Sequence, residues 1–181
     1  MTVMIPFEEG ERGLDWLALT DALAAGHLLP KAEVEDVFLY RDDNTLLNRS
    51  AWIKGMGLAV KCATVFPNNK TQGKPMIGGA VNLFSDEDGV LEAILDFHLV
   101  TKWKTAGDSL LAARRLARPD SREILIVGAG TVGRALYAAY SAAFPDAKFT
   151  VWNRSPAGAK EFQTDLPDVA IADDLEAAVR A

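Results

Sequence analysis

Between residues 34 and 97 the chain alternates short runs of apolar and β-branched residues with clusters of turn-forming residues. The breaks fall at residues 42–44 (Asp-Asp-Asn), 54–55 (Lys-Gly), 67–75 and 85–89 (Ser-Asp-Glu-Asp-Gly). Short runs with such separators are typical of strands joined by tight turns, so we expect a mostly antiparallel sheet. The predicted strands are Val34–Tyr40, Thr45–Trp52, Leu58–Phe66, Met76–Phe84 and Val90–Phe97.

Two other stretches have helical spacing. Apolar residues over residues 14–24, followed by Gly26, predict an early amphipathic helix. Residues 99–117 predict a long helix that ends before Pro119. We therefore expect residues 1–120 to form an α+β domain.

After residue 121 the pattern changes to strands that alternate with helices. A buried strand at Ile124–Val127 is followed at once by a glycine cluster and a helical pattern. Further strands are predicted at Lys148–Trp152 and Asp168–Ile171, with helices at Pro156–Phe162 and after Asp173-Asp174. This order predicts an α/β fold, a Rossmann-type dinucleotide-binding domain over residues 121–181. Because such a sheet usually has about six strands, we expect this domain to be truncated at its C-terminus.

The glycine cluster, residues 128–133 (Gly-Ala-Gly-Thr-Val-Gly), predicts a site for a dinucleotide pyrophosphate. Gly128 would permit the tight turn, Gly130 would let a phosphate approach bare backbone, and Gly133 would let helix and strand pack closely. The helix beginning at Thr131 and Val132 would offer free N–H groups to the anion. The alternative is a glycine turn without a ligand.

The end of the second parallel strand bears on the choice of cofactor. An acidic residue there would favour NAD, but this chain has Asn153, Arg154 and Ser155. Because a neutral donor, a cation and a hydroxyl suit a 2′-phosphate, we expect NADP(H) to be preferred, with NAD(H) possible. Alternatively, Ser155 simply caps the next helix before Pro156. Both interpretations can hold together.

Composition narrows the class of protein. The chain has 25 acidic and 19 basic residues, hence a net charge of −6, and no basic stripe, so no nucleic-acid partner is expected. No apolar run reaches the roughly 18 residues of a membrane span, and a cytoplasmic location is the default. Cys62 is interpreted as core filler, His27 and His98 as structural residues, and no metal site is predicted.

Two lysines are candidates for chemistry. Lys61 lies in the middle of an apolar strand, which suggests either a group that binds an anion or a lysine on the solvent face. Lys104 and Asp108 are four residues apart on the long helix and could form an ordinary exposed ion pair. The neighbouring Ala106 and Gly107 make that helix face small, as a ligand or another backbone would require.

Several motifs together resemble the ornithine cyclodeaminase/mu-crystallin family over residues 46–154. They are Lys61 with Val65-Phe66-Pro67-Asn68-Asn69, Gly73-Lys74-Pro75, Leu99-Val100-Thr101, Lys104-Thr105-Ala106, Leu116-Ala117-Arg118-Pro119 and Val127-Gly128-Ala129-Gly130. The resemblance implies a substrate and dimerisation domain interleaved with a dinucleotide-binding domain, a small α-amino or α-imino acid substrate, and a homodimer. It also implies that Lys61 holds the substrate carboxylate and that Lys104 and Thr105 contact the cofactor.

The chain departs from the family pattern at four places. Lys104 replaces the usual arginine, and Met76 replaces a threonine that contacts the cofactor. Asn48, by ungapped counting, replaces the glutamate that cyclodeaminases use for the side-chain amine of ornithine, which counts against ornithine. Arg41 is matched loosely to a further carboxylate-binding arginine. The acid/base aspartate of cyclodeaminases would lie beyond Ala181.

The resemblance leaves three functions open. The first is an NAD(P)H-dependent reductase of a cyclic α-imino acid such as Δ1-pyrroline-2-carboxylate or Δ1-piperideine-2-carboxylate, with Lys61 and Lys104 as catalytic residues and Arg41, Asn48 and Asp108 near the substrate. The second is an ornithine cyclodeaminase that uses bound NAD+. The third is a protein that binds NADPH and a small ligand without catalysis.

Overall fold

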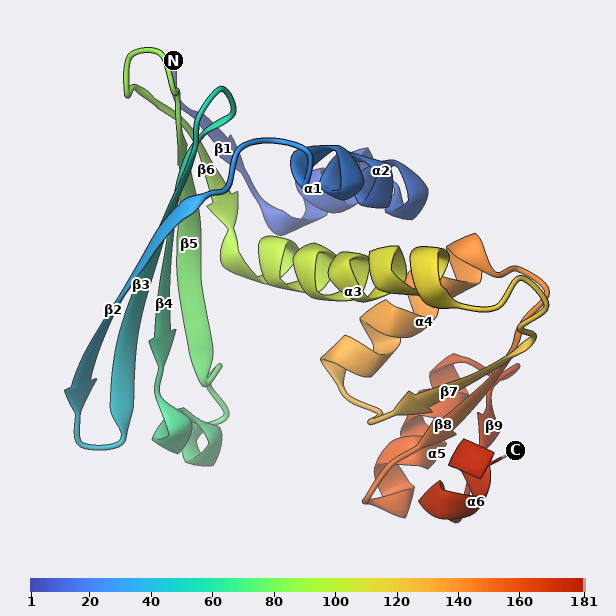
Figure 1. Cartoon of the computed structure of the whole chain (residues 1–181). Coiled ribbons are helices and arrows are strands. Elements are labelled where there is room, and N and C mark those ends of the chain that lie inside the picture. Colours follow the sequence, from blue (N-terminus) through green and yellow to red (C-terminus); the bar gives the residue numbers. More distant parts are fainter. Residues whose placement is uncertain (181) are drawn as a thin grey trace. The chain divides into compact units, whose positions relative to one another are not determined.

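The computed structural model describes residues 1–180, and within this range the strands form two separate sheets (Figure 1). The chain divides into two compact units whose segments are interleaved. The first unit holds Met1–Leu14 and Ala25–Thr101, and the second holds Asp15–Ala24 and the chain from Lys102 onward. The functional boundary expected near residue 120 stays a prediction.

The sheet of the first unit confirms the predicted antiparallel strands. Its spatial order is β1-β6-β5-β4-β3-β2, and β2 to β6 are antiparallel neighbours, whereas β1 runs parallel to β6. Residues 67–72 between β4 and β5 form a short 3-10 helix, η1 (Pro67–Gln72). The strands are β1 (Val3–Ile5), β2 (Glu33–Arg41), β3 (Asn44–Ile53), β4 (Gly57–Val65), β5 (Ile77–Phe84) and β6 (Leu91–Asp96).

Glycines let the helices of each unit pack closely. In the first unit, α1 (Phe7–Gly13) presents Gly10 to Leu99, and a Cβ at Gly10 would lie 2.1 Å from Leu99 Cδ2. In the second unit, a Cβ at Gly107 would lie 2.8 Å from Leu19 Cδ2. The small face at Ala106 and Gly107 is therefore occupied by another helix. The helices concerned are α2 (Trp16–Gly26) and α3 (Phe97–Leu116).

Two further contacts join α2 to α3. The rings of Trp16 and Trp103 stack with their centroids 3.8 Å apart, and both side chains are buried. Arg114 pairs with Asp21 at 2.8 Å and donates to the hydroxyl of the fully buried Thr20. A buried hydroxyl that finds such a partner avoids a desolvation penalty of about 1–3 kcal/mol.

The second sheet confirms the predicted α/β fold. Strands β7, β8 and β9 are parallel neighbours in that order. Helix α4 packs on β7 and helix α5 on β9, over a core that includes Ile126, Val151, Phe162 and Val169. The elements in chain order are β7 (Glu123–Val127), α4 (Thr131–Ala143), β8 (Lys148–Trp152), α5 (Pro156–Asp165), β9 (Ala170–Ile171) and α6 (Leu175–Arg180).

Candidate active site

The glycine turn connects β7 to α4, and two of its glycines have structural reasons. Gly128 has a φ of 111°, a conformation that side chains rarely adopt. A Cβ at Gly133 would lie 2.0 Å from the carbonyl oxygen of Gly128 and 3.4 Å from Ile126 Cγ2. Gly133 therefore allows α4 to start directly against the strand that precedes it.

Gly130 differs from Gly128 and Gly133, because no contact within the protein requires a glycine there. Its φ of −83° is ordinary, and a Cβ built there would meet no protein atom within 4 Å. Gly130 is also the N-cap of α4, and no side chain caps the helix. The backbone is thus bare and its first N–H groups point out of the helix end, an arrangement that suits a phosphate group. The turn could accommodate a dinucleotide pyrophosphate, for which the N–H groups near Thr131 and Val132 are the candidate donors.

Asn153 ties the end of β8 to this turn. Its Oδ1 accepts the N–H of Ala129 at 3.2 Å, and its Nδ2 donates to the carbonyl of Ser155 at 2.9 Å. The N–H of Gly128 also donates to the carbonyl of Trp152 at 2.8 Å. The structure therefore brings together the glycine turn and the strand end that the sequence assigned to the cofactor. Much of the hydrogen-bonding capacity of Asn153 is used within the protein.

Arg154 and Ser155 lie beside this junction and are exposed. Ser155 is the N-cap of α5, with Pro156 in the first turn, as the alternative interpretation predicts, but its hydroxyl makes no capping bond. Arg154 forms no hydrogen bond or ion pair with any residue in the range 1–180. Its guanidinium thus has no competing anion among these residues.

Lys61 lies at the centre of β4 and is partly buried. Its Nζ lies 4.7 Å from the ring centroid of Phe97, a residue only 5% exposed, which gives the ammonium a cation–π contact. Gly79 on β5 makes room for this ring, because a Cβ there would come within 2.9 Å of it. Lys61 is therefore held against an aromatic ring and does not lie on a purely solvent-facing surface.

The residue directly opposite Lys61 on β3 is Arg49. Arg49 in turn lies opposite Asp36 on β2, and the two form a two-point ion pair in which Nε–Oδ1 is 2.7 Å. The Arg49 guanidinium holds the pKa of Asp36 below its usual value, chiefly through these hydrogen bonds. Sequence reasoning did not single out Arg49. Its place opposite Lys61 depends on the Lys54-Gly55 turn, which sets which residues of β3 and β4 are opposite each other.

The same register places Asn48 and Arg41 on the other face of the sheet from Lys61. Asn48 pairs with Cys62, the neighbour of Lys61, and side chains alternate between faces along a strand. Arg41 is five residues from Asp36 on β2, so it too is directed to the opposite face. The structure does not bring either residue beside Lys61, and their predicted contacts with the substrate remain untested.

Lys104, Thr105 and Asp108 lie on α3, in the second unit. Lys104 Nζ is 2.8 Å from Asp108 Oδ2, and the two side chains are 66% and 43% exposed. This is the exposed ion pair that the spacing allowed, and such a pair adds at most about 1 kcal/mol to stability. Thr105 is exposed as well. Both lysine and threonine are thus accessible to a ligand.

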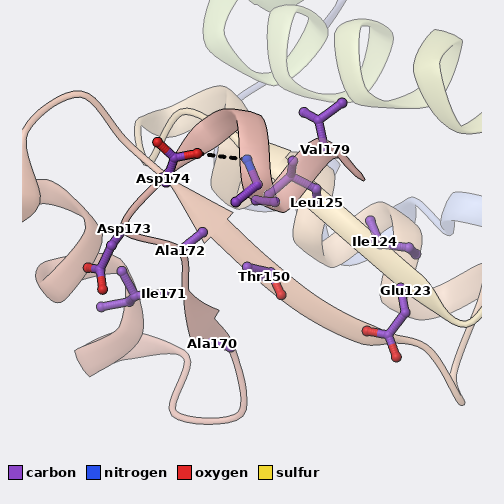
Figure 2. Close-up of a pocket in the computed structure, with 12 residues that line it drawn as sticks. Glu123, Ile124, Leu125, Thr150, Ala170, Ile171, Ala172, Asp173, Asp174 and Val179 are labelled. Atoms are coloured by element: carbon purple, nitrogen blue, oxygen red, sulfur yellow. Dashed lines mark hydrogen bonds between the residues drawn. The ribbon is translucent and has the colours of Figure 1, made fainter. Parts of the chain in front are cut away.

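A cavity of about 960 Å³ lies elsewhere in the second unit (Figure 2). Its lining comes from β7, β8, β9 and α6, including Leu125, Thr150 and Ile171. Asp174 at its rim accepts the N–H of Ala177 and caps α6. None of the sequence-predicted site residues lines this cavity.

Two searches of the described chain were negative. Within residues 1–180, no group of three or more His, Cys, Asp or Glu side chains is arranged to hold a metal ion. Over the same range, the helices are too short or too polar to cross a bilayer.

The parallel strand, bare glycine turn and uncapped helix define the second unit as a dinucleotide-binding α/β fold. Comparison with known proteins agrees. A profile of the ornithine cyclodeaminase/mu-crystallin family matches residues 49–181, and the chain belongs to that family.

Three relatives illustrate the likeness. Δ1-pyrroline-2-carboxylate reductase of Paracoccus denitrificans is 47% identical over 171 residues, which are 92% of this chain and 54% of that protein. Ketimine reductase mu-crystallin of Rattus norvegicus is 28% identical over 67% of this chain and 39% of its own length. Δ1-pyrroline-2-carboxylate reductase of Thermococcus litoralis, solved with NADH and L-proline, has a TM-score of 0.80 at 21% identity, over 97% of this chain and 58% of that chain.

The likeness to the Thermococcus structure supports the fold alone, because the sequence identity is low. The chain spans about half the length of the Paracoccus relative.

Proposed function

We propose that this protein is an NAD(P)H-dependent reductase of a small cyclic α-imino acid, of the Δ1-pyrroline-2-carboxylate or Δ1-piperideine-2-carboxylate type. The observation that carries this proposal is the 47% identity to the Paracoccus reductase, over a span long enough to include both Lys61 and the glycine turn. The geometry supports it in both units, through a cation held on the sheet and a bare helix end.

Lys61 would hold the carboxylate of the substrate, because an ammonium contacting an aromatic ring in a partly buried strand gains from an anionic partner. The backbone at Gly130 and the start of α4 would hold the pyrophosphate. A bound dinucleotide would supply a hydride to the imine carbon. Lys104 would contribute a further positive charge for the carboxylate or the phosphates, with Thr105 and Asp108 beside it.

We further propose that NADPH is preferred over NADH. No carboxylate follows β8, whereas Arg154 is exposed and without an anionic partner among the described residues, and the Ser155 hydroxyl makes no capping bond. A guanidinium binds a phosphate through two parallel hydrogen bonds, so Arg154 suits the 2′-phosphate. Asn153 would act mainly by holding the strand end against the turn.

A homodimer formed through the sheet of the first unit is also proposed. All nine residues of the edge strand β2 are exposed, among them Val37, Phe38 and Leu39. An exposed apolar edge of this length needs covering. An archaeal alanine dehydrogenase of similar fold, with a TM-score of 0.82, is described as a dimer. Light scattering at micromolar concentration tests this proposal, and a monomer would contradict it.

The reaction is tested by following NADPH consumption with Δ1-pyrroline-2-carboxylate and with Δ1-piperideine-2-carboxylate. Lys61→Ala should lower kcat/KM at least about 100-fold and leave NADPH affinity nearly unchanged, because Lys61 acts on the substrate. Lys104→Arg should be tolerated better than Lys104→Ala.

Two results would contradict the proposed reaction. Ammonia release from ornithine without net cofactor consumption would indicate a cyclodeaminase. Tight NADPH binding with no turnover of either imino acid would indicate a binding protein without catalysis. Normal turnover by Lys61→Ala would remove Lys61 from the site.

A further inference from the structure

The side chain of Asn153, directly after β8, is hydrogen-bonded at both ends of its amide. Its Oδ1 accepts the N–H of Ala129 in the glycine turn at 3.2 Å, and its Nδ2 donates to the carbonyl of Ser155 at 2.9 Å. The Ser155 carbonyl also accepts the N–H groups of Gly158 and Ala159 in the first turn of α5, at 3.1 and 3.4 Å. One side chain therefore connects the glycine turn, the end of β8 and the start of α5, and we call its two bonds the amide clasp.

The two ends of the amide clasp require different chemistry. The N–H of Ala129 needs an acceptor, whereas the carbonyl of Ser155 needs a donor, and an amide supplies both. A carboxylate would place its second oxygen against the carbonyl oxygen of Ser155, where two acceptors would face each other without a hydrogen between them. The clasp therefore accounts for an amide at the position where NAD-preferring domains carry an acidic residue.

Gly158 makes room for this amide. A Cβ built at Gly158 would lie 2.6 Å from Nδ2 of Asn153 and 3.6 Å from its Cγ. Apart from its chain neighbours and its own helix, no other heavy atom of residues 1–180 lies within 4 Å of that Cβ. A real Cβ does not approach another atom as closely as 2.6 Å. An alanine at this position and the amide in its present place are thus incompatible.

The backbone does not require a glycine at this position. Gly158 is the third residue of α5 and does not have a positive φ. Glycine is among the least favourable residues inside a helix, because it loses the most conformational freedom on folding. The space for the Asn153 amide is therefore the structural reason for this glycine.

We propose that Gly158 is a positioning residue of the cofactor site and that it supports the preference for NADPH through Asn153. This inference rests on the proposed function, since it takes the glycine turn as the pyrophosphate site and Arg154 as the residue that binds the 2′-phosphate. Because Arg154 directly follows Asn153, the amide clasp fixes the distance between these two sites. NADPH must meet both sites at once, whereas a ligand that uses one site does not depend on their distance.

Titration of the full chain with three ligands tests this independently of turnover. NADPH uses both sites, NADH lacks the 2′-phosphate, and adenosine 2′-monophosphate lacks the pyrophosphate. Gly158→Ala should weaken NADPH binding about tenfold and change the binding of NADH and of adenosine 2′-monophosphate less than about threefold each, because only NADPH gains from two sites held at a fixed distance. The preference for NADPH would thus fall although Arg154 is intact.

The stability of Gly158→Ala separates a positioning role from a structural one. The atom that the new Cβ displaces lies at the end of a side chain and not in the backbone. Because alanine also has the higher helix propensity, the thermal midpoint should stay as in wild type or rise. A lower midpoint with equal losses for all three ligands would mean a general disturbance of the unit and would reject the proposal.

Gly13→Ala is the matched control. Gly13 is also a helical glycine without a positive φ, at the end of α1, and a Cβ there would meet no atom within 4 Å. It should leave the affinities for all three ligands as in wild type.

A double-mutant cycle tests whether Gly158 acts through Asn153. Asn153→Ala removes the amide and should reduce the preference for NADPH at least as much as Gly158→Ala does. Adding Gly158→Ala to this variant should have no further effect, because the methyl group then has no amide to displace. Additive losses would show that Gly158 acts by another route and would overturn the proposal.

The outcomes separate this proposal from the proposed function. A preference for NADPH that depends on Gly158 and Asn153, without any imine reduction, would sustain the positioning role and reject the reductase. Imine reduction by wild type, with an unchanged preference for NADPH in Gly158→Ala, would reject the positioning role and sustain the reductase. Equal binding of NADH and NADPH by wild type would also overturn the positioning role.

Discussion

The glycine turn and the cross-strand row of Asp36, Arg49 and Lys61 are built in opposite ways. The turn is a local structure, in which Gly128, Gly130 and Gly133 lie within six consecutive residues. Its two partners outside the turn, Trp152 and Asn153, are neighbours at the end of the next strand. The row draws Asp36, Arg49 and Lys61 from three strands. Its composition depends on the register of two hairpins, and a shift of one residue would send each side chain to the other face.

This difference decides what a sequence can reveal. Local chemistry is visible as a motif, because the residues that act together are neighbours in the chain. Non-local chemistry becomes visible only when the register is known. The predictions below challenge first the local site and then the register that supports the non-local one, in order of decreasing effect.

The largest effect is expected at Gly133. Gly133→Ala would place a Cβ 2.0 Å from the carbonyl oxygen of Gly128, a backbone atom that cannot move without shifting α4 or the turn. We expect a loss of about 2–4 kcal/mol in the free energy of unfolding. Thermal unfolding measures it, with about 2–4 °C of Tm for each kcal/mol in a chain of this size.

Gly130→Ala is the matched variant in the same turn. A Cβ at Gly130 meets no protein atom within 4 Å and its φ is ordinary, so stability should not fall. Affinity for the dinucleotide should fall roughly 10- to 100-fold, because the methyl group would occupy the place of the phosphate. Titration of NADPH by fluorescence measures this. A variant that binds NADPH normally would show that the bare backbone has another purpose.

The sequence predicted the fold well where the pattern is local. Apolar periodicity and turn residues predict the antiparallel strands β2 to β6, the long helix α3 and the order of elements from β7 to α6. Strand β9 is shorter than expected. The short β1 and α1 were not predicted. Three residues of strand carry little pattern, and β1 depends on its pairing with β6.

For the candidate site, the sequence pointed to the residues that belong to motifs but not to those that depend on strand register. The glycines, Asn153 and Lys61 were proposed from motifs. Asn48 was placed by ungapped counting along the chain, and its neighbour Arg49 was not considered. The pairing of β3 with β4 puts Arg49 opposite Lys61 and turns Asn48 to the other face. One residue of register therefore separates an arginine beside the lysine from an amide behind it, which composition and periodicity cannot resolve.

The third prediction concerns the choice of cofactor. Wild type should favour NADPH over NADH at least about tenfold in kcat/KM, which corresponds to ~1.4 kcal/mol of differential binding. Arg154→Ala should remove most of this preference, because the exposed guanidinium would lose its pairing with the 2′-phosphate. Assays with both cofactors on both proteins measure the ratio. An NADH-preferring wild type, or an Arg154→Ala variant with unchanged preference, would contradict it.

The smallest effect is expected at Asp86, which holds the turn that sets the β3–β4 register. Its carboxylate accepts Trp52 Nε1–H and the N–H of Gly55, the latter at 2.6 Å. These bonds, that to Trp52 first, lower the pKa of Asp86 below its ordinary value of 3.8. A lowered carboxyl pKa stabilises the folded protein above the unfolded pKa, and the gain is lost as pH falls through the folded pKa.

Asp86→Asn should therefore lower the urea midpoint at pH 7 slightly and make the midpoint less dependent on pH between about 5 and 2. Glu92→Gln removes one charge at an exposed position of β6 and is the control. Equal pH profiles in both variants would mean that the turn holds its register without Asp86.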